Sequence, residues 1–304
     1  MSLWVTAGLL ALLSTTLLGP VSVRLAGSTW VSRAPRAAVA LWQAIGVSAC
    51  VAAIGAGLCV AIARFHDNFG GGMAALLNGL IDGHPLRGLG LPDALGLTLA
   101  ADLGVVLLCV MGATMARTVT TRARHRHILN VIAGSTPSVP GAVMLDHPHA
   151  VAYCLPGIRP RIVISAGTLR VLTSEELSAV IAHERGHAHE RHGLIMLPMA
   201  GLRDLFGWIP YASLAPPAIG ALLEMAADDH AARRHRPETL ASALVRMATP
   251  HAAPACTFGL GTLGVSARVT RLLREQRTSR RTALVAGAGA AGLVALPVVV
   301  LLVS

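Results

Sequence analysis

The sequence predicts a mostly α-helical integral membrane protein with about four transmembrane helices and a small α+β domain outside the bilayer. Three observations predict this class. Hydrophobic residues make up 54% of the 304 residues and charged residues only 13%, which is too apolar for an ordinary soluble domain. The mean hydropathy is +0.62. Four apolar stretches each supply the roughly 20 residues that a helix needs to cross a bilayer.

The apolar stretches divide the chain into three parts. They cover residues 3–23, 37–63, 94–115 and 282–303. We expect a membrane domain over residues 1–116, a separate domain over 117–281 and a C-terminal transmembrane helix over 282–304. The first stretch is long and has no positive charge before it, so we expect an uncleaved helix rather than a signal peptide. Asp102 is costly in lipid, so we expect it to face a helix partner or water.

Arginine alone decides the predicted orientation, because the chain contains no Lys. Three Arg lie between the first two stretches, and six more lie between residues 268 and 281, whereas the 64–93 loop holds two Arg against three Asp. The positive-inside rule places the 24–36 loop and the 117–281 region in the cytoplasm, with both termini outside. The composition, rich in Ala, Arg and Gly, suggests a bacterial cell membrane.

The net charge of +10 needs no nucleic acid to explain it. Much of the excess of Arg flanks the apolar stretches, where it meets anionic headgroups of the lipid bilayer. A protein that binds DNA would carry a basic recognition motif, and the sequence contains none. We therefore expect no direct contact with nucleic acid.

The pentapeptide His183-Glu184-Arg185-Gly186-His187 is an HExxH motif. Residues four apart lie on one face of a helix, so the imidazoles of His183 and His187 can bind one Zn²⁺ ion. Glu184 can take a proton from the attacking water, which is the chemistry of a zinc peptidase. The alternative is a solvated, His-rich helix face, since the motif is followed by His189, Glu190 and His192.

The local sequence predicts that the motif lies on a helix. Thr173 and Glu176 fit a capping box at its start. Apolar residues over 177–181 then recur at helical spacing. We expect a helix from Ser174 to about Gly193, with the two His in its middle.

Glu224 is the predicted third ligand, because catalytic zinc usually takes three protein ligands plus water. It follows two Leu residues on a predicted helix and should face inward with them. Asp228 lies four residues later on the same face, where it can hydrogen-bond a ligand His and fix its tautomer. The alternatives are Asp204, Glu238 or a charged helix end without a metal. We expect one Zn²⁺ per chain.

Two further features would face a substrate. The β-branched segment Arg161–Ser165 is predicted to be a strand. In zincin-type peptidases such a strand forms an edge that pairs with an extended substrate; the alternative is a core strand. Tyr211 or His230 could stabilise the oxyanion of a tetrahedral intermediate.

The run RPRIVISAGTLRVLTSEELSAVIAHERGHAHE, followed by LLEMAADDHAARR, resembles the membrane-embedded gluzincin metallopeptidases. The similarity covers roughly residues 150–240 and is greatest to the BlaR/MecR type, the antirepressor sensor-transducers of β-lactam resistance. The HtpX/Ste-type membrane peptidases share much of the pattern. The resemblance implies a zincin-like cytoplasmic catalytic domain in which His183, His187 and Glu224 bind zinc, Glu184 is the general base and Asp228 orients a ligand.

The sequence departs from the BlaR/MecR type after its last apolar stretch. Those proteins carry a large extracellular penicillin-binding domain there, whereas this chain ends at Ser304 and has no Lys for a Ser-x-x-Lys acylation motif. We therefore do not expect direct covalent sensing of β-lactams. A signal would enter through the 64–93 loop, the spans, a separate sensor protein or self-association.

The predicted function is a zinc metalloendopeptidase that acts in regulated signalling. By resemblance, its substrate is a cytoplasmic transcriptional repressor of the BlaI/MecI type. One alternative is an HtpX-like protease for quality control of membrane proteins. Another is a catalytically quiet zinc-binding scaffold, against which the intact Glu184 argues. A purely structural membrane protein would leave the HExxH motif and Glu224 unexplained.

Overall fold

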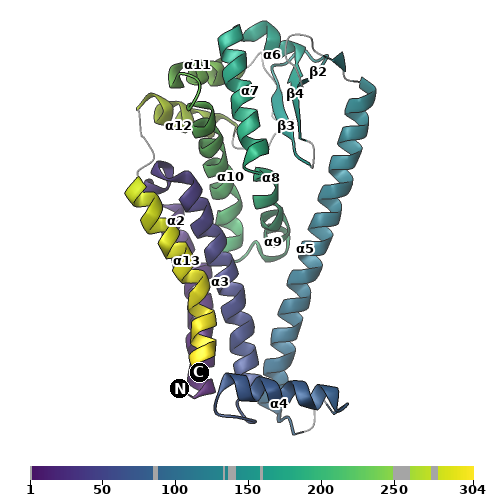
Figure 1. Ribbon diagram of the computed structural model, residues 1–304, viewed down its shortest axis with the longest axis vertical. Coiled ribbons are helices and arrows are strands. Elements are labelled where there is room, and N and C mark those ends of the chain that lie inside the picture. The colour runs from purple at the N-terminus through teal and green to yellow at the C-terminus, as the bar shows by residue number, and fades with distance from the viewer. Residues whose placement is uncertain are drawn as a thin grey trace.

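The computed structural model describes residues 2–84, 88–132, 134–135, 142–157, 160–248, 261–274 and 280–304. Its architecture confirms a mostly α-helical protein with a small four-stranded sheet. Figure 1 shows long helices at one end of the molecule, and the sheet with shorter helices at the other. Both termini lie beside α4 (Phe69–Ile81), at the end farthest from the sheet.

Four helical segments are long and apolar enough to cross a membrane, which confirms the four predicted stretches. They are Leu3–Ala26, Pro35–Ile62, Leu91–Val131 and Arg280–Val303. The first is built from α1 (Leu3–Thr16), a π-helical turn (Leu17–Val21) and α2 (Ser22–Ala26). The wider turn contains Pro20, which has no N–H to donate and is accommodated by the altered hydrogen-bond pattern.

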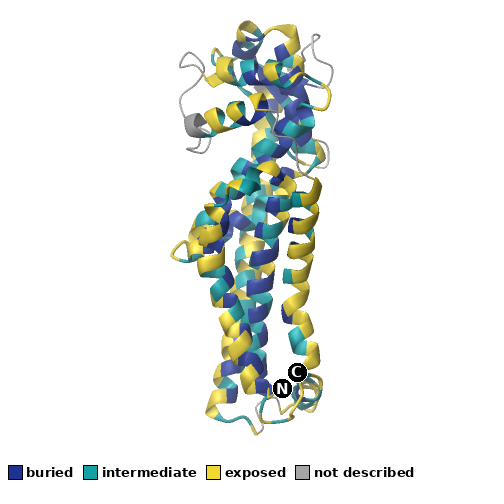
Figure 2. Cartoon of the chain, turned by 90° about the vertical axis from the view of Figure 1, so that its left-hand side faces the viewer, coloured by how far each residue is buried: buried dark blue, intermediate teal, exposed yellow. Residues whose placement is uncertain are grey.

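α3 (Pro35–Ile62) is the central helix of the membrane part and packs against α1, α5 (Leu91–Ile132) and α13 (Arg280–Val303). Small residues allow this close packing. A Cβ atom at Gly57 of α3 would lie 2.8 Å from the carbonyl oxygen of Gly96 on the neighbouring helix. Figure 2 shows exposed residues along much of the outer helices, as expected for surfaces that face lipid.

α5 (Leu91–Ile132) is much longer than the predicted stretch 94–115. Its 42 residues extend over about 63 Å, roughly twice the thickness of the bilayer core. The helix therefore continues beyond its apolar half to the sheet, where Arg126 donates a hydrogen bond to the carbonyl oxygen of Pro156 at 3.1 Å. Asp102 lies exposed on this helix.

The sheet has the strand order β1 (Gly134–Ser135), β2 (Ala142–Leu145), β4 (Arg161–Ser165) and β3 (Ala152–Leu155). β4 pairs parallel with β2 and antiparallel with β3. The predicted strand is thus confirmed with its bounds, but the prediction that it forms an edge is wrong. Val163 and Ile164 are almost fully buried, as in a core strand, and β3 lies at the edge.

The remaining helices surround the sheet and connect it to the membrane part. They are a 3₁₀ turn (Thr29–Arg33), α6 (Ala166–Val171), α7 (Ser174–His189), α8 (His192–Ile195), α9 (Leu197–Phe206), α10 (Pro210–Ala231), α11 (Pro237–Ala248) and α12 (Gly261–Leu273). α7 ends four residues before the predicted Gly193. Arg191 has a φ of 51°, a left-handed conformation that ends the helix and turns the chain into α8.

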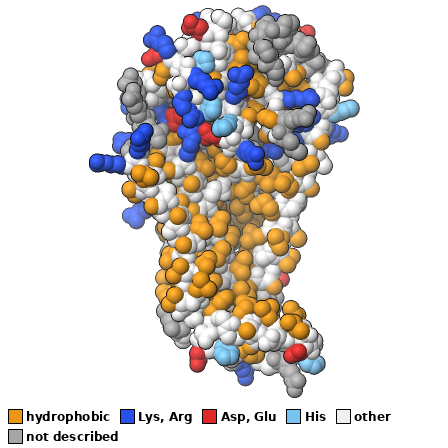
Figure 3. All heavy atoms as spheres, in the orientation of Figure 1, with side chains coloured by type: hydrophobic (Ala, Val, Ile, Leu, Met, Phe, Trp, Pro, Cys, Tyr) orange, Lys and Arg blue, Asp and Glu red, His pale blue; other side chains and the backbone are white. Residues whose placement is uncertain are grey.

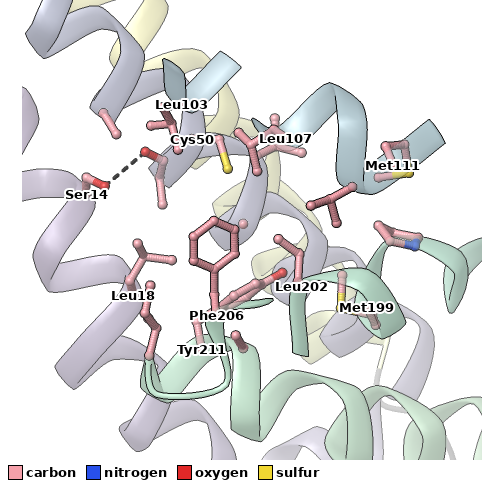
Figure 4. A pocket seen from close by; sticks show the side chains of 18 of the residues that line it. Ser14, Leu18, Cys50, Leu103, Leu107, Met111, Met199, Leu202, Phe206 and Tyr211 are labelled. Atoms are coloured by element: carbon pink, nitrogen blue, oxygen red, sulfur yellow. Dashed lines mark hydrogen bonds between the residues drawn. The ribbon is translucent and has the colours of Figure 1, made fainter. Parts of the chain in front are cut away.

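An apolar cavity of about 340 Å³ lies between α1, α3, α5, α9 and α10 (Figure 4). The polar groups of two lining residues are satisfied within the protein. The Ser14 hydroxyl donates to the carbonyl oxygen of Ala49 at 3.0 Å, and the Tyr211 hydroxyl donates to that of Trp42 at 3.1 Å. In Figure 3 apolar side chains cover the middle of the molecule, whereas most Arg, Asp, Glu and His side chains lie at the end with the sheet and a few lie at the opposite end.

Candidate metal centre

α7 carries the HExxH motif well inside a firmly anchored helix. The Thr173 hydroxyl accepts the Glu176 N–H at 3.3 Å, and the Glu176 carboxylate accepts the Thr173 N–H at 2.9 Å, which confirms the predicted capping box. The same carboxylate accepts a hydrogen bond from Ser242 on α11 at 2.6 Å. These contacts fix the start of α7 and therefore the orientation of its inward face.

A glycine lets α10 approach the motif. A Cβ atom at Gly186 would lie 3.0 Å from Cβ of His230 and 3.3 Å from Cα of Ala227. A larger side chain would hold the two helices apart. This close approach brings Glu224 and Asp228, one turn apart on α10, to the imidazoles of α7.

His183, His187 and Glu224 form a group whose ligand atoms all lie within 4.8 Å of one another. Nε2 of His183 lies 3.1 Å from Nε2 of His187. Oε2 of Glu224 lies 3.5 Å from Nε2 of His183, and Oε1 of Glu224 lies 3.4 Å from Nε2 of His187. Tetrahedral bonds of about 2.0–2.1 Å to zinc separate two ligand atoms by roughly 3.3 Å. The three residues therefore fit a zinc ion in both chemistry and spacing.

The charges around the group also suit a cation, which would displace the proton of His183 when it binds. Burial lowers the pKa of His187 to about 4, so it is neutral, as a metal ligand must be. Burial would raise the pKa of Glu224, but hydrogen bonding to His183 and the charge of Arg268 hold it far below its usual value. Burial also opposes a charge on His183, yet the Asp228 and Glu224 carboxylates outweigh it and raise its pKa to about 9. Two anionic carboxylates thus surround His183.

Asp228 and Arg268 form an outer layer around these residues. Oδ1 of Asp228 lies 3.0 Å from Nδ1 of His183. Arg268, from α12, donates to both oxygens of Asp228 at 2.8 and 2.6 Å, and its Nη1 lies 2.9 Å from Oε2 of Glu224. In the sequence, Arg268 stands out only as one of the arginines that precede the last apolar stretch. No local pattern identifies it, because its partners lie 40 or more residues earlier in the chain.

Glu184 is buried between the imidazoles and the edge strand. It is 8% exposed, and burial raises its pKa despite the nearby His183. The backbone amide of Cys154 in β3 lies near enough to the Glu184 carboxylate to offset part of the rise in its pKa, and α7 packs against β3, so this carboxylate lies beside the edge of the sheet.

The two candidates for oxyanion stabilisation have different surroundings. Tyr211 is 3% exposed and packs against Trp42 of α3, with ring centroids 5.9 Å apart. Nδ1 of His230 lies 2.9 Å from Nη2 of Arg233. Neither residue makes a hydrogen bond or ion pair to the His-His-Glu group within the described chain, and their role in catalysis stays a prediction.

Part of the sequence is similar to known peptidases. Residues 119–221 match peptidase family M48. The matched segment contains the whole HExxH motif and ends just before Glu224. The chain is also 36% identical over 70 residues to a protein described as "Protease HtpX homolog" from Thermoplasma acidophilum. That alignment covers 23% of this chain and 22% of the relative, so the chain matches about a fifth of the relative's length.

No solved structure matches the chain. Peptidases of family M48 are zinc metallopeptidases, and the two similarities agree with the four apolar helices in supporting a membrane metallopeptidase. The BlaR/MecR type is neither supported nor opposed by these matches, which are equally compatible with an HtpX-like protein.

Proposed function

We propose that this chain is a membrane-embedded zinc metalloendopeptidase. The observation that carries the proposal is the convergence of His183, His187 and Glu224 at separations that one tetrahedral zinc would impose. Glu184, buried directly beside them, supplies the acid–base group that a binding site alone would not need. The match to a family of zinc peptidases supports the same conclusion.

In the proposed mechanism, His183, His187 and Glu224 hold one zinc ion. When bound, zinc supplies a Lewis acid that polarises the scissile carbonyl and activates water. Glu184 takes the proton of the attacking water and passes it to the leaving amine. Its raised pKa favours this double use, because a catalytic acid–base group works best when its pKa lies near the working pH. Asp228 orients His183.

The edge strand β3 is the proposed binding surface for substrate. An extended peptide can add a strand to an exposed edge through backbone hydrogen bonds. Because α7 packs against β3 and the Cys154 amide lies near Glu184, a peptide along β3 would lie next to the general base. This replaces β4, the strand that the sequence suggested for this role.

The proposed topology places the site in the cytoplasm. The site and the termini lie at opposite ends of the molecule (Figure 1), so a bilayer around the long helices separates them. The positive-inside rule assigns the 24–36 loop and the 117–281 domain to the cytoplasm, and the termini to the outside of a bacterial cell membrane.

Two classes of protein substrate follow from this location. The first is a cytoplasmic repressor of the BlaI/MecI type, in line with the BlaR/MecR resemblance. The second is a misfolded membrane protein, favoured by the similarity to an HtpX homologue. Co-expression with a repressor of this type distinguishes them: a signalling protease cleaves it at one site, whereas a quality-control protease produces new termini across many membrane proteins.

Zinc content and proteolysis of the detergent-purified protein test the proposal. Wild type is compared with Glu184→Gln and with the control Glu175→Gln, which alters an exposed residue of the same helix. We expect about one zinc per chain in all three. New peptide termini in a proteome extract should appear with wild type and control, and fall at least about 10²-fold with Glu184→Gln. Zinc without cleavage by any of them would favour the scaffold, and absence of zinc from wild type would refute the proposal.

A further inference from the structure

His192 lies against the second nitrogen of His187. Nε2 of His187 faces His183 and Glu224, while its Nδ1 lies 2.8 Å from Nδ1 of His192. The two rings meet edge to face with centroids 4.7 Å apart, and His192 is only 4% exposed. The left-handed residue Arg191, which ends α7, turns the chain so that His192 packs back against the motif.

The contacts continue from His192 to the membrane helix α3. Nε2 of His192 lies 3.4 Å from Oε2 of Glu190. The Glu190 carboxylate accepts two hydrogen bonds from Arg36, at 2.9 and 2.6 Å. Arg36 lies in the first turn of α3, one of the four helices able to cross the membrane. It also donates to the carbonyl oxygen of Ala226 on α10 at 2.8 Å.

One arrangement of protons satisfies the whole chain of contacts. If Nε2 of His187 faces the metal, its Nδ1 carries the proton and donates to Nδ1 of His192. Nε2 of His192 is then protonated and donates to Glu190, which is ionised and held by Arg36. A ligand imidazole usually donates its second N–H to such a partner, which fixes the tautomer and the direction of the ring.

We propose that His192 is a positioning residue for His187, and that Glu190 and Arg36 link this metal ligand to the membrane helix α3. The proposal rests on the proposed function, because it takes His187 to be a zinc ligand. The surroundings of the other predicted ligand, His183, support the proposal. Nδ1 of His183 lies beside the carboxylate of Asp228, and Arg268 binds that carboxylate. Both imidazoles thus lead to a carboxylate that an arginine holds, but among the described residues only the contacts from His187 reach a candidate membrane span.

The first test compares three variants with wild type, using the full-length protein in lipid nanodiscs. They are His192→Ala, His192→Asn and the control His189→Ala, which removes an exposed His from the same segment. Zinc affinity is measured by competition with a chelator, and the visible absorption of the cobalt(II)-loaded protein reports ligand geometry. We expect His192→Ala to weaken zinc binding about 10–100-fold and to alter the cobalt spectrum. Asn, which offers an acceptor near the position of Nδ1, should restore part of both.

The second test asks whether Arg36 acts through His192. Arg36→Gln should weaken zinc binding by a smaller factor than His192→Ala, and combining the two should weaken it no further than His192→Ala alone. The control Arg33→Gln alters an exposed Arg just outside α3 and should bind zinc as wild type does. Additive effects would mean that Arg36 acts through α10 instead, and would overturn the link.

The outcomes separate this inference from the proposed function. A folded His192→Ala protein with wild-type zinc affinity and an unchanged cobalt spectrum would overturn the positioning role alone. A wild-type protein that binds neither zinc nor cobalt would overturn the proposed function, and this inference with it.

Discussion

The carboxylate of Asp228 lies 3.0 Å from Nδ1 of His183, whereas the other ring nitrogen, Nε2, faces Glu224. Asp228 is fully buried and also accepts two hydrogen bonds from Arg268. Those bonds hold the carboxylate ionised, since they lower its pKa although burial would raise it. A fixed anion at this position sets both the tautomer and the direction of the His183 ring.

Replacing Asp228 by Asn should therefore weaken zinc binding about 10–100-fold. Asn has nearly the same shape but no charge, so it favours less strongly than Asp the tautomer of His183 that leaves Nε2 free for the metal. Chelator competition measures the affinity. Asp204→Asn, at an exposed position on α9, serves as the matched control. Equal zinc affinities in the two variants would show that Asp228 has no part in orienting His183.

Replacing Arg268 by Met should destabilise the metal-free protein more than the zinc-loaded one. Arg268 is a cation that contacts both Glu224 and Asp228, and leaving the buried carboxylate of Asp228 without it costs about 3–5 kcal/mol. Zinc would supply positive charge to Glu224 in its place. The rise in melting temperature on adding zinc should therefore be larger for Arg268→Met than for wild type.

Thermal unfolding in detergent, with and without a chelator, measures this difference. Arg274→Met is the matched control, because it removes an exposed Arg from the end of the same helix. If zinc raised the melting temperature equally in Arg268→Met, Arg274→Met and wild type, the guanidinium would not be compensating the charge of the metal site.

Local patterns in the sequence predicted the parts of the fold that depend on neighbouring residues. The four apolar stretches became long helices because their length and composition suit a bilayer. The capping box at Thr173 formed as expected, since it involves residues only three apart. The spacing of His183 and His187 indicated one helix face, and Glu224, predicted as the third ligand that catalytic zinc usually takes, lies with them.

The other features depend on contacts between distant segments, which spacing does not encode. β4 became a core strand because β3 pairs with its second edge. Arg268 reaches Asp228 across 40 residues, and Arg36 reaches Glu190 across 154. The alternative of a solvated, His-rich helix face included His192, but the left-handed residue Arg191 turns His192 inward, where it is buried. A helical extrapolation past Glu190 could not anticipate that turn.

Replacing Gly186 by Val should weaken zinc binding by moving α7 away from α10. Even a Cβ atom at this position would lie 3.3 Å from Cα of Ala227, which is backbone and cannot rotate away. Overpacking of this kind costs about 1–3 kcal/mol, and any increase in the distance between the helices draws Glu224 away from His183. We expect a lower melting temperature together with weaker zinc binding.

A matched control is Gly220→Val, on α10, where an added Cβ would meet nothing within 4 Å. Both substitutions place a β-branched residue in a helix, so helix propensity affects them alike. If Gly186→Val bound zinc as tightly as Gly220→Val, the approach of the two helices at Gly186 would not set the position of Glu224.

Replacing Glu176 by Gln should destabilise the protein at pH 7 but not in acid. Burial would raise the pKa of Glu176, but hydrogen bonds from Ser242 and Thr173 and the charge of Arg246, 3.2 Å away, outweigh it and lower the pKa. A lowered pKa in the folded protein means that the ionised form stabilises it above the unfolded pKa of about 4.3. That contribution is lost as the pH falls through the folded value.

Gln can still form the capping box, so this substitution removes the charge and keeps the cap. The expected loss is about 1–2 kcal/mol at pH 6–8, and it should shrink steadily below about pH 4.3. Melting temperatures of wild type and Glu176→Gln across this range measure it. Glu238→Gln, at a largely exposed position, should show little difference at any pH. A deficit in Glu176→Gln that stayed constant into acid would mean that Glu176 stabilises α7 through packing, because a contribution from its charge must vanish once the carboxylate is protonated.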